Sequence, residues 1–115
     1  MSGFEPGRGE VWDLNLDPTA GHEQAGLRPA LMVSVDLFNA GPAALVVVIP
    51  ITRTARGVRW HVPVDPPEGG LVAKSFVQCE NVRSVSKSRL KRLRGRVSAI
   101  TLQEVEDRLR ILLGL

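Results

Sequence analysis

Hydrophobic and polar positions alternate over several short stretches of this chain, and the pattern predicts a protein built mainly of β-strands. Along residues 10–16 the alternation places Trp12, Leu14 and Leu16 on one face, as in a strand with one buried and one exposed side. Residues 44–49 are apolar throughout and mostly β-branched, which is typical of a strand buried on both faces. Further strands are expected at residues 30–35, 58–64, 75–79, 82–85 and 95–98, and Pro63 marks the one at 58–64 as an edge strand.

The C-terminal residues change from the two-residue period of a strand to the period of a helix. Apolar side chains recur on one helical face at Leu102, Val105, Leu109 and Leu112. Thr101 and Glu104 have the spacing of a capping box, and Gly114 is typical of a helix end. Because a small sheet needs one helix to cover its open face, the pattern predicts a small β-barrel with a C-terminal amphipathic helix.

Length and composition fit a single domain spanning residues 1–115, with 43% hydrophobic and 23% charged residues. No apolar stretch is long enough to span a membrane, and the N-terminus lacks the pattern of a signal peptide. We therefore expect a cytoplasmic protein without membrane contact. Cys79 is the only cysteine, and its apolar neighbours favour a buried side chain over a nucleophile.

The whole chain has a formal charge of +3 and a sequence pI near 9.8, and its basic residues are concentrated in one region. They are Arg83, Lys87, Arg89, Lys91, Arg92, Arg94 and Arg96. Such a run is equally compatible with a solvated surface and with contact to a nucleic-acid backbone. The charge therefore suits an anionic partner without identifying one.

The polar loop at residues 21–29 holds the most concentrated candidate chemistry, a carboxylate, an amide and a guanidinium just ahead of a strand. On the residues alone, an ordinary polar loop with an ion pair is the favoured interpretation. His22 and His61 could form an acid–base pair, but isolated histidines are more often incidental. No nucleotide-binding glycine loop or ligand-spaced Cys/His set is present, so neither a metal nor a cofactor is expected.

Four ordered segments nevertheless resemble the motifs of MazF/PemK-type toxins. The loop and strand from Asp17 to Ala30, with Glu-Gln-Ala-Gly-x-Arg-Pro in the middle, is similar to the signature loop of that family. Gly9–Trp12 resembles its opening strand, and Val48–Thr52 its strand ending in Pro-hydrophobic-Thr. Glu80–Val85 is similar to its acidic-amide-hydrophobic-Arg-Ser segment. The likeness runs from about residue 6 to residue 115, which is nearly the whole chain.

The resemblance implies an SH3-like β-barrel that forms a homodimer and cleaves single-stranded RNA at a short recognition sequence. In this family the ribose 2′-hydroxyl attacks the adjacent phosphate, which leaves a 2′,3′-cyclic phosphate and a 5′-hydroxyl. No metal is required, because the substrate supplies the nucleophile. The implied partners are the RNA and a cognate, MazE-like antitoxin that holds the toxin in check.

The same resemblance assigns roles to individual residues. Arg28 matches the catalytic arginine, whose planar donors suit phosphate oxygens, and Thr52 matches the catalytic threonine. The substrate-binding positions are Glu23, Gln24, Asn81 and Arg83. Glu23 is also a candidate base, and Asn81 stands where many members carry glutamine. Trp60 could stack on a base, although a core or interface position is the more common use of a tryptophan.

Two other classes of protein use similar small barrels. A gyrase-poison-like toxin would bind a topoisomerase and would not need both Arg28 and Thr52. A non-catalytic SH3-like binding module usually has an aromatic-lined groove, whereas this chain has no tyrosine. Cleavage of single-stranded RNA distinguishes the three alternatives.

Overall fold

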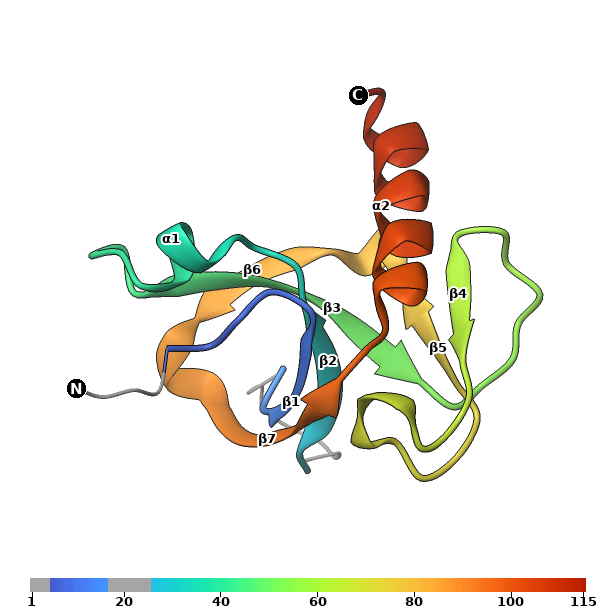
Figure 1. Cartoon of the computed structure of the whole chain (residues 1–115), viewed down its shortest axis with the longest axis horizontal. Coiled ribbons are helices and arrows are strands. Elements are labelled where there is room, and N and C mark those ends of the chain that lie inside the picture. Colours follow the sequence, from blue (N-terminus) through green and yellow to red (C-terminus); the bar gives the residue numbers. More distant parts are fainter. Residues whose placement is uncertain (1–4, 17–25) are drawn as a thin grey trace.

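The computed structural model describes residues 5–16 and 26–115. Within them the chain forms short strands followed by a C-terminal helix (Figure 1). The strands are β1 (Glu10–Leu14), β2 (Arg28–Met32), β3 (Leu45–Thr52), β4 (His61–Val64), β5 (Ser75–Gln78), β6 (Arg83–Ser86) and β7 (Leu90–Arg96). The helices are α1 (Asp36–Asn39) and α2 (Ala99–Leu113), with 3-10 turns η1 (Glu68–Gly70), η2 (Cys79–Asn81) and η3 (Lys87–Arg89).

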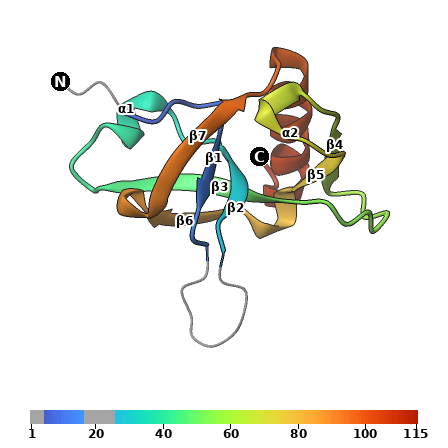
Figure 2. The ribbon, with the colours of Figure 1, turned by 90° about the horizontal axis from the view of Figure 1, so that it is seen from below.

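The strands form one antiparallel, strongly curved sheet. Its order is β4-β5-β3-β2-β1-β7, and β6 pairs with β3 outside this path. The long strand β3 organises the sheet, because β2 pairs with one of its edges while β6 and then β5 follow the other. Helix α2 stands over one end of the curved sheet, as the two ribbon views show (Figures 1 and 2). The predicted class, a mainly β barrel-like domain with a C-terminal helix, is confirmed.

The core consists of two apolar clusters, and single strands contribute to both. Val46 and Val48 of β3 lie in the smaller cluster, whereas Ile49 and Ile51 lie in the larger one. Trp12, Leu14 and Leu16 share the smaller cluster, as predicted. The expected half-exposed strand at residues 10–16 is wrong for the opposite face, however. Val11 is buried there in the larger cluster, and Asp13 is buried as the ion-pair partner of Arg92 and Arg94.

Several strand predictions differ from the structure in their extent; the strands expected at 30–35 and 44–49 are Arg28–Met32 and Leu45–Thr52. The last strand is Leu90–Arg96 rather than 95–98, because the arginine-rich run pairs along the whole of β1. The strand predicted at 58–64 begins only at His61, since the preceding residues form a turn in which the His61 amide donates to the Val58 carbonyl oxygen (3.0 Å). Its edge position is confirmed, because β4 ends the strand order.

Helix α2 packs as predicted but begins at Ala99, ahead of the cap expected at Thr101. Val105 is buried in the larger cluster, and Leu102 and Leu109 pack against it. The capping box expected at Thr101 and Glu104 is wrong. Ser98 caps the helix by accepting a hydrogen bond from the Thr101 amide (3.1 Å), which places Thr101 inside the first turn. Gly114 ends the helix in the left-handed conformation, as expected.

Candidate active site

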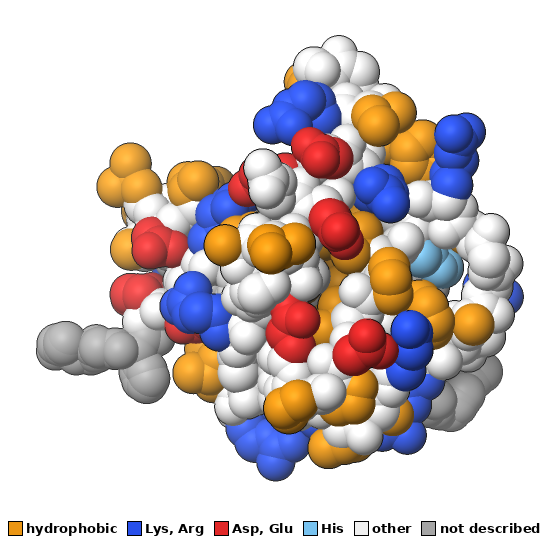
Figure 3. All heavy atoms as spheres, turned by 45° about the vertical axis from the view of Figure 1, so that its right-hand side comes forward, with side chains coloured by type: hydrophobic (Ala, Val, Ile, Leu, Met, Phe, Trp, Pro, Cys, Tyr) orange, Lys and Arg blue, Asp and Glu red, His pale blue; other side chains and the backbone are white. Residues whose placement is uncertain are grey.

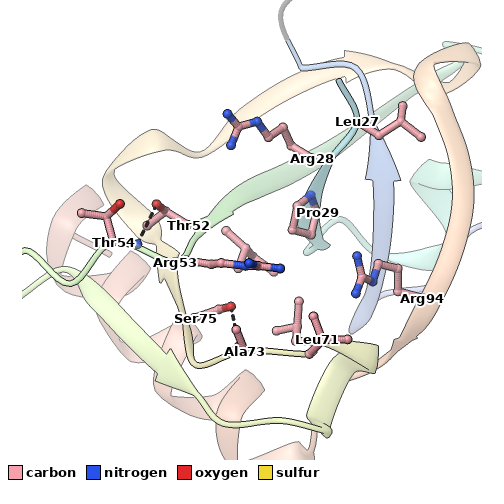
Figure 4. Close-up of a pocket in the computed structure, with 12 residues that line it drawn as sticks. Leu27, Arg28, Pro29, Thr52, Arg53, Thr54, Leu71, Ala73, Ser75 and Arg94 are labelled. Atoms are coloured by element: carbon pink, nitrogen blue, oxygen red, sulfur yellow. Dashed lines mark hydrogen bonds between the residues drawn. The ribbon is translucent and has the colours of Figure 1, made fainter. Parts of the chain in front are cut away.

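A pocket of about 420 Å³ opens where β2 begins and β3 ends. The β2–β3 ladder pairs Ala30 with Pro50, and its continuation by two residues leads to Arg28 on one strand and Thr52 on the other. Both residues line the pocket (Figure 4). Sheet register thus brings together two residues that are 24 positions apart in the sequence.

The Thr52 hydroxyl is held in a fixed orientation by the backbone. Its Oγ1 atom accepts a hydrogen bond from the Thr54 amide (3.1 Å), so one lone pair of the oxygen is already used. The hydroxyl keeps its proton available for donation to an acceptor in the pocket. The side chain is therefore suited to donate to an anionic oxygen.

Three arginines line the pocket from three strands or strand ends. Arg53 directly follows Thr52, and Arg94 comes from β7; both point into the hollow, while Arg28 lies at its rim (Figure 4). The described lining residues include no carboxylate. The pocket is accordingly electropositive and suits a phosphate or another anion.

Arg94 is the most rigidly held of these cations. Its Nη2 donates to the Gly70 carbonyl oxygen (2.8 Å) and its Nη1 lies 3.3 Å from Oδ1 of the buried Asp13. The close approach of η1 to β7 requires glycine on both sides. A Cβ on Gly95 would lie 2.7 Å from the Gly70 nitrogen, and a Cβ on Gly70 would collide with the Arg94 carbonyl group. With most of its donors already used, Arg94 forms a wall of the pocket, whereas Arg28 and Arg53 are exposed.

The remaining predicted site residues lie elsewhere. Glu23 and Gln24 fall outside the described residues, as does His22. Asn81 in η2 and Arg83, the first residue of β6, are exposed. They lie along the β3 edge opposite β2 and do not line the pocket. The two catalytic candidates are therefore brought together, and Asn81 and Arg83 are separate from them.

His61 and Cys79 are both buried, and neither lines the pocket. His61 is buried, and its Nε2 lies 2.8 Å from Oε2 of Glu80, away from the pocket lining. Burial raises the pKa of the Cys79 thiol to about 11, so the thiol stays protonated at neutral pH. The prediction that Cys79 is a buried apolar residue is confirmed.

Sequence reasoning missed Arg53 and Thr54 as parts of the pocket. In the sequence, only its position next to Thr52 indicates Arg53. Thr54 contributes its backbone amide, which the identity of its side chain does not reveal. Among the described residues, no group of three or more His, Cys, Asp or Glu side chains could hold a metal ion. The described part of the chain also has no helix long and apolar enough to cross a membrane.

Fold and pocket together define a small, helix-capped β-sheet protein with a basic, hydroxyl-bearing pocket at the end of two neighbouring strands. Residues 7–113 match the family model of the PemK-like, MazF-like toxins of type II toxin–antitoxin systems. Endoribonuclease MazF9 of Mycobacterium tuberculosis is 36% identical over 113 residues, which cover 94% of this chain and 96% of that protein. Endoribonuclease PemK of Escherichia coli is 38% identical over 110 residues, covering 92% and 80%.

Solved structures agree with the sequence relatives. MazF from Deinococcus radiodurans has a TM-score of 0.81 at 34% identity, with 97% of this chain and 99% of that chain covered. A MazE–MazF structure from the same organism has a TM-score of 0.83 at 35% identity, with 97% and 98% covered. The chain belongs to the PemK-like, MazF-like toxin family, as its motifs indicated.

Proposed function

We propose that this toxin is a sequence-specific endoribonuclease that cleaves single-stranded RNA without a metal ion. The observation that carries the proposal is the shared pocket of Arg28 and Thr52, with further positive charge from Arg53 and no carboxylate among its described lining residues. Its relatives MazF9, PemK and EndoA are named endoribonucleases. A basic pocket with a hydrogen-bond donor suits a phosphodiester in its charged transition state.

The reaction we propose is attack by the ribose 2′-oxygen on the adjacent phosphorus. The new bond joins the 2′-oxygen to phosphorus, and the bond from phosphorus to the 5′-oxygen breaks. The products are a 2′,3′-cyclic phosphate and a 5′-hydroxyl, with the 2′-hydroxyl proton taken up by the enzyme and a proton returned to the leaving oxygen. No oxidant, cofactor or protein nucleophile takes part.

Arg28 and Thr52 stabilise the charge that develops in this step. The Arg28 guanidinium binds the equatorial oxygens of the phosphorane, for which its planar donors are suited. The Thr52 hydroxyl, oriented by the Thr54 amide, donates to one of these oxygens. Either Thr52, acting as a relay, or Glu23, acting as a base, handles the 2′-hydroxyl proton.

The substrate extends beyond the pocket. We assign contacts with bases or ribose to Glu23 and Gln24 in the signature loop, because single-stranded RNA is read through its unstacked bases. Asn81 and Arg83 contact the RNA outside the cleavage pocket, as their exposed positions beside β3 permit. These four residues set which short sequence is cut.

Single-turnover cleavage of a short RNA tests the proposal. We expect Arg28→Ala to lower the rate by about a hundredfold or more, because charge stabilisation in the transition state is lost. Thr52→Ala should cost about 10²- to 10⁴-fold if the hydroxyl relays the proton, and less if it only positions the phosphate. Glu23→Gln distinguishes the two proton acceptors, since it is slow only if Glu23 is the base. EDTA should leave the wild-type rate unchanged.

His22→Ala and His61→Ala serve as matched controls after each variant has been shown to fold. Each should cost less than about tenfold, since neither has a role in the proposed step. A fast Thr52→Ala enzyme beside an inactive His61→Ala enzyme would contradict the assignment and favour a histidine pair. Absence of any RNA cleavage would favour the gyrase-poison-like toxin or the binding module.

We also propose a cytoplasmic homodimer regulated by a cognate, MazE-like antitoxin. Structures of relatives include an endoribonuclease in complex with its cognate antitoxin from a mycobacterial species and MazE–MazF of Deinococcus radiodurans. An acidic, disordered antitoxin tail can fold along a basic surface such as the pocket rim. Co-expression with the neighbouring small open reading frame should rescue growth, and a neighbour that neither binds nor rescues would refute this pairing.

A further inference from the structure

The arginines of this protein fall into two groups according to their acidic partners. Those of β7 lie beside carboxylates: Arg92 and Arg94 share Asp13, and Arg96 pairs with Glu10. The loop between β3 and β4 carries a second group, Arg53, Arg56 and Arg59. All three are exposed, and none has an acidic partner among the described residues. The loop therefore presents three exposed arginines whose charge no carboxylate of the described residues offsets, a property that Arg83 and Lys91 of the basic region share.

This loop, residues 53–60, projects from the side of the sheet between the ends of β3 and β4 (Figures 1 and 2). Each of its ends is held by hydrogen bonds. The Thr54 amide donates to the Thr52 hydroxyl, and at the other end Nε of Arg108 in α2 donates to the Arg59 carbonyl oxygen (3.0 Å). Its three arginines recur at every third residue. The loop therefore presents its charge from an anchored position.

A second hollow, of about 320 Å³, lies at the far end of the loop. It is lined by Arg59, Trp60, Arg108 and Ile111, and the Arg59 guanidinium carbon lies 5.4 Å from the centre of the Trp60 ring. The space-filling view brings the side of the molecule with β4 forward, and basic and apolar side chains lie next to one another on it (Figure 3). An aromatic ring with a stacked guanidinium provides a surface on which a nucleobase can stack.

We propose that the loop of residues 53–60 binds the phosphate backbone of single-stranded RNA that leaves the cleavage pocket and guides it to a stacking site at Trp60. Arg53 already lines the cleavage pocket, and Arg59 lines the hollow at Trp60, so the loop joins the two sites. Arg56 lies between them and is exposed. This inference rests on the proposed RNA substrate, and it adds the loop to Asn81 and Arg83 as a place where RNA is bound outside the cleavage pocket.

RNA fits this surface better than an acidic protein segment does. The path begins inside the pocket where a substrate phosphate must lie, so an occupant that continues from the pocket carries its negative charge on the same backbone. Stacking at Trp60 in addition requires flat rings, which every nucleotide supplies. A peptide rich in glutamate matches the charge alone.

The test uses a uniformly 2′-O-methylated single-stranded RNA, which lacks the nucleophile and is not cut. Its affinity is measured by fluorescence anisotropy over a series of salt concentrations. Because each single-strand phosphate contact contributes roughly 0.7 to the slope of log affinity against log salt, R53Q/R56Q/R59Q should lower the slope by about 2. Arg56→Gln alone, at an exposed position, should lower it by about 0.7. Trp60→Ala should weaken binding about tenfold or more.

The matched control is R92Q/R96Q/R110Q, which removes the same charge from exposed arginines that each have an acidic partner. It should leave the slope nearly unchanged. Equal losses in both triple variants, or no loss in the loop variant, would overturn the proposal. So would a loop variant that loses affinity only for a polyglutamate peptide, which would assign the surface to a protein partner. Cleavage of unmodified RNA is measured separately, so an inactive wild-type protein would count against the proposed function alone.

Discussion

Asp13 is the buried carboxylate around which the basic strand is arranged. Its side chain is 6% exposed and receives Arg92 through Oδ2 (2.8 Å) and Arg94 through Oδ1 (3.3 Å). Arg92 is 67% exposed, whereas Arg94 is 18% exposed and reaches the pocket wall. The carboxylate therefore links the position of Arg94 at the candidate site to the interior of the sheet. The two ion pairs contribute differently to the free energy of unfolding, because solvent screens the pair that includes Arg92.

Replacing Asp13 by Asn should destabilise the protein by about 3 kcal/mol, because Arg94 then loses its partner in a mostly buried position. Urea denaturation followed by tryptophan fluorescence measures this free energy. Arg92→Gln is the control, with an expected cost below about 1 kcal/mol. Similar losses of unfolding free energy in the two variants would contradict a larger contribution from the buried Asp13–Arg94 pair.

At this scale the chemistry of the site could be predicted only through the resemblance to the toxin family. The residues alone favoured an ordinary polar loop around Arg28, since nothing local connects it with Thr52. Their common pocket arises from the register of β2 and β3, which pairs Ala30 with Pro50 and which single residues do not reveal. The compensation of the β7 arginines was equally hidden, because their partners lie about 80 positions away in the sequence.

Among the elements, α2 shows most clearly why local patterns were incomplete. Its apolar stripe was predictable because helix periodicity is a local property. Its start was not, because two groups from different parts of the chain satisfy the N-terminal amides. Ser98 accepts from the Thr101 amide, and Glu68 of η1 accepts from the Ser98 amide (2.8 Å). Glu68 thus performs from 30 residues away the role that a capping box gives to the third helical residue.

The pKa of Glu68 reflects this contact. Burial raises the pKa, but hydrogen bonds from Thr101 and Ser98 together outweigh it, so the net pKa lies below the ordinary glutamate value. A lowered pKa in the folded state means that the carboxylate stabilises the fold at neutral pH and loses this effect as the pH falls through that pKa.

Glu68→Gln should therefore lower the free energy of unfolding by about 1 kcal/mol at pH 7. The difference from wild type should shrink as the pH falls through the lowered pKa of Glu68, where the wild-type carboxylate also becomes protonated. Thermal unfolding of both proteins between pH 3 and pH 7 measures it. A difference that stays constant over this range would contradict a role for the charge and leave only packing.

For the molecule as a whole, the distribution of exposed apolar side chains supports the proposed homodimer. Val35, Leu37 and Phe38 are exposed at α1, beside Leu45 at the start of β3. Exposed apolar side chains on two elements that pack together are typical of an interaction site, and a two-fold pair covers the same patch on both copies. Ile100, at the start of α2, is exposed to a similar degree but lies elsewhere on the molecule.

We expect this patch to hold the two copies together. Light scattering at micromolar concentration should give twice 12.5 kDa for the wild-type protein. Leu37→Glu should shift the protein to a monomer, because a charge in the middle of an apolar contact is desolvated without a partner. Ile100→Glu is the matched control, since Ile100 is 71% exposed and Leu37 85%, and it should leave the dimer intact. A wild-type monomer with full cleavage activity would refute the dimer, whereas dissociation caused by Ile100→Glu alone would move its interface to α2.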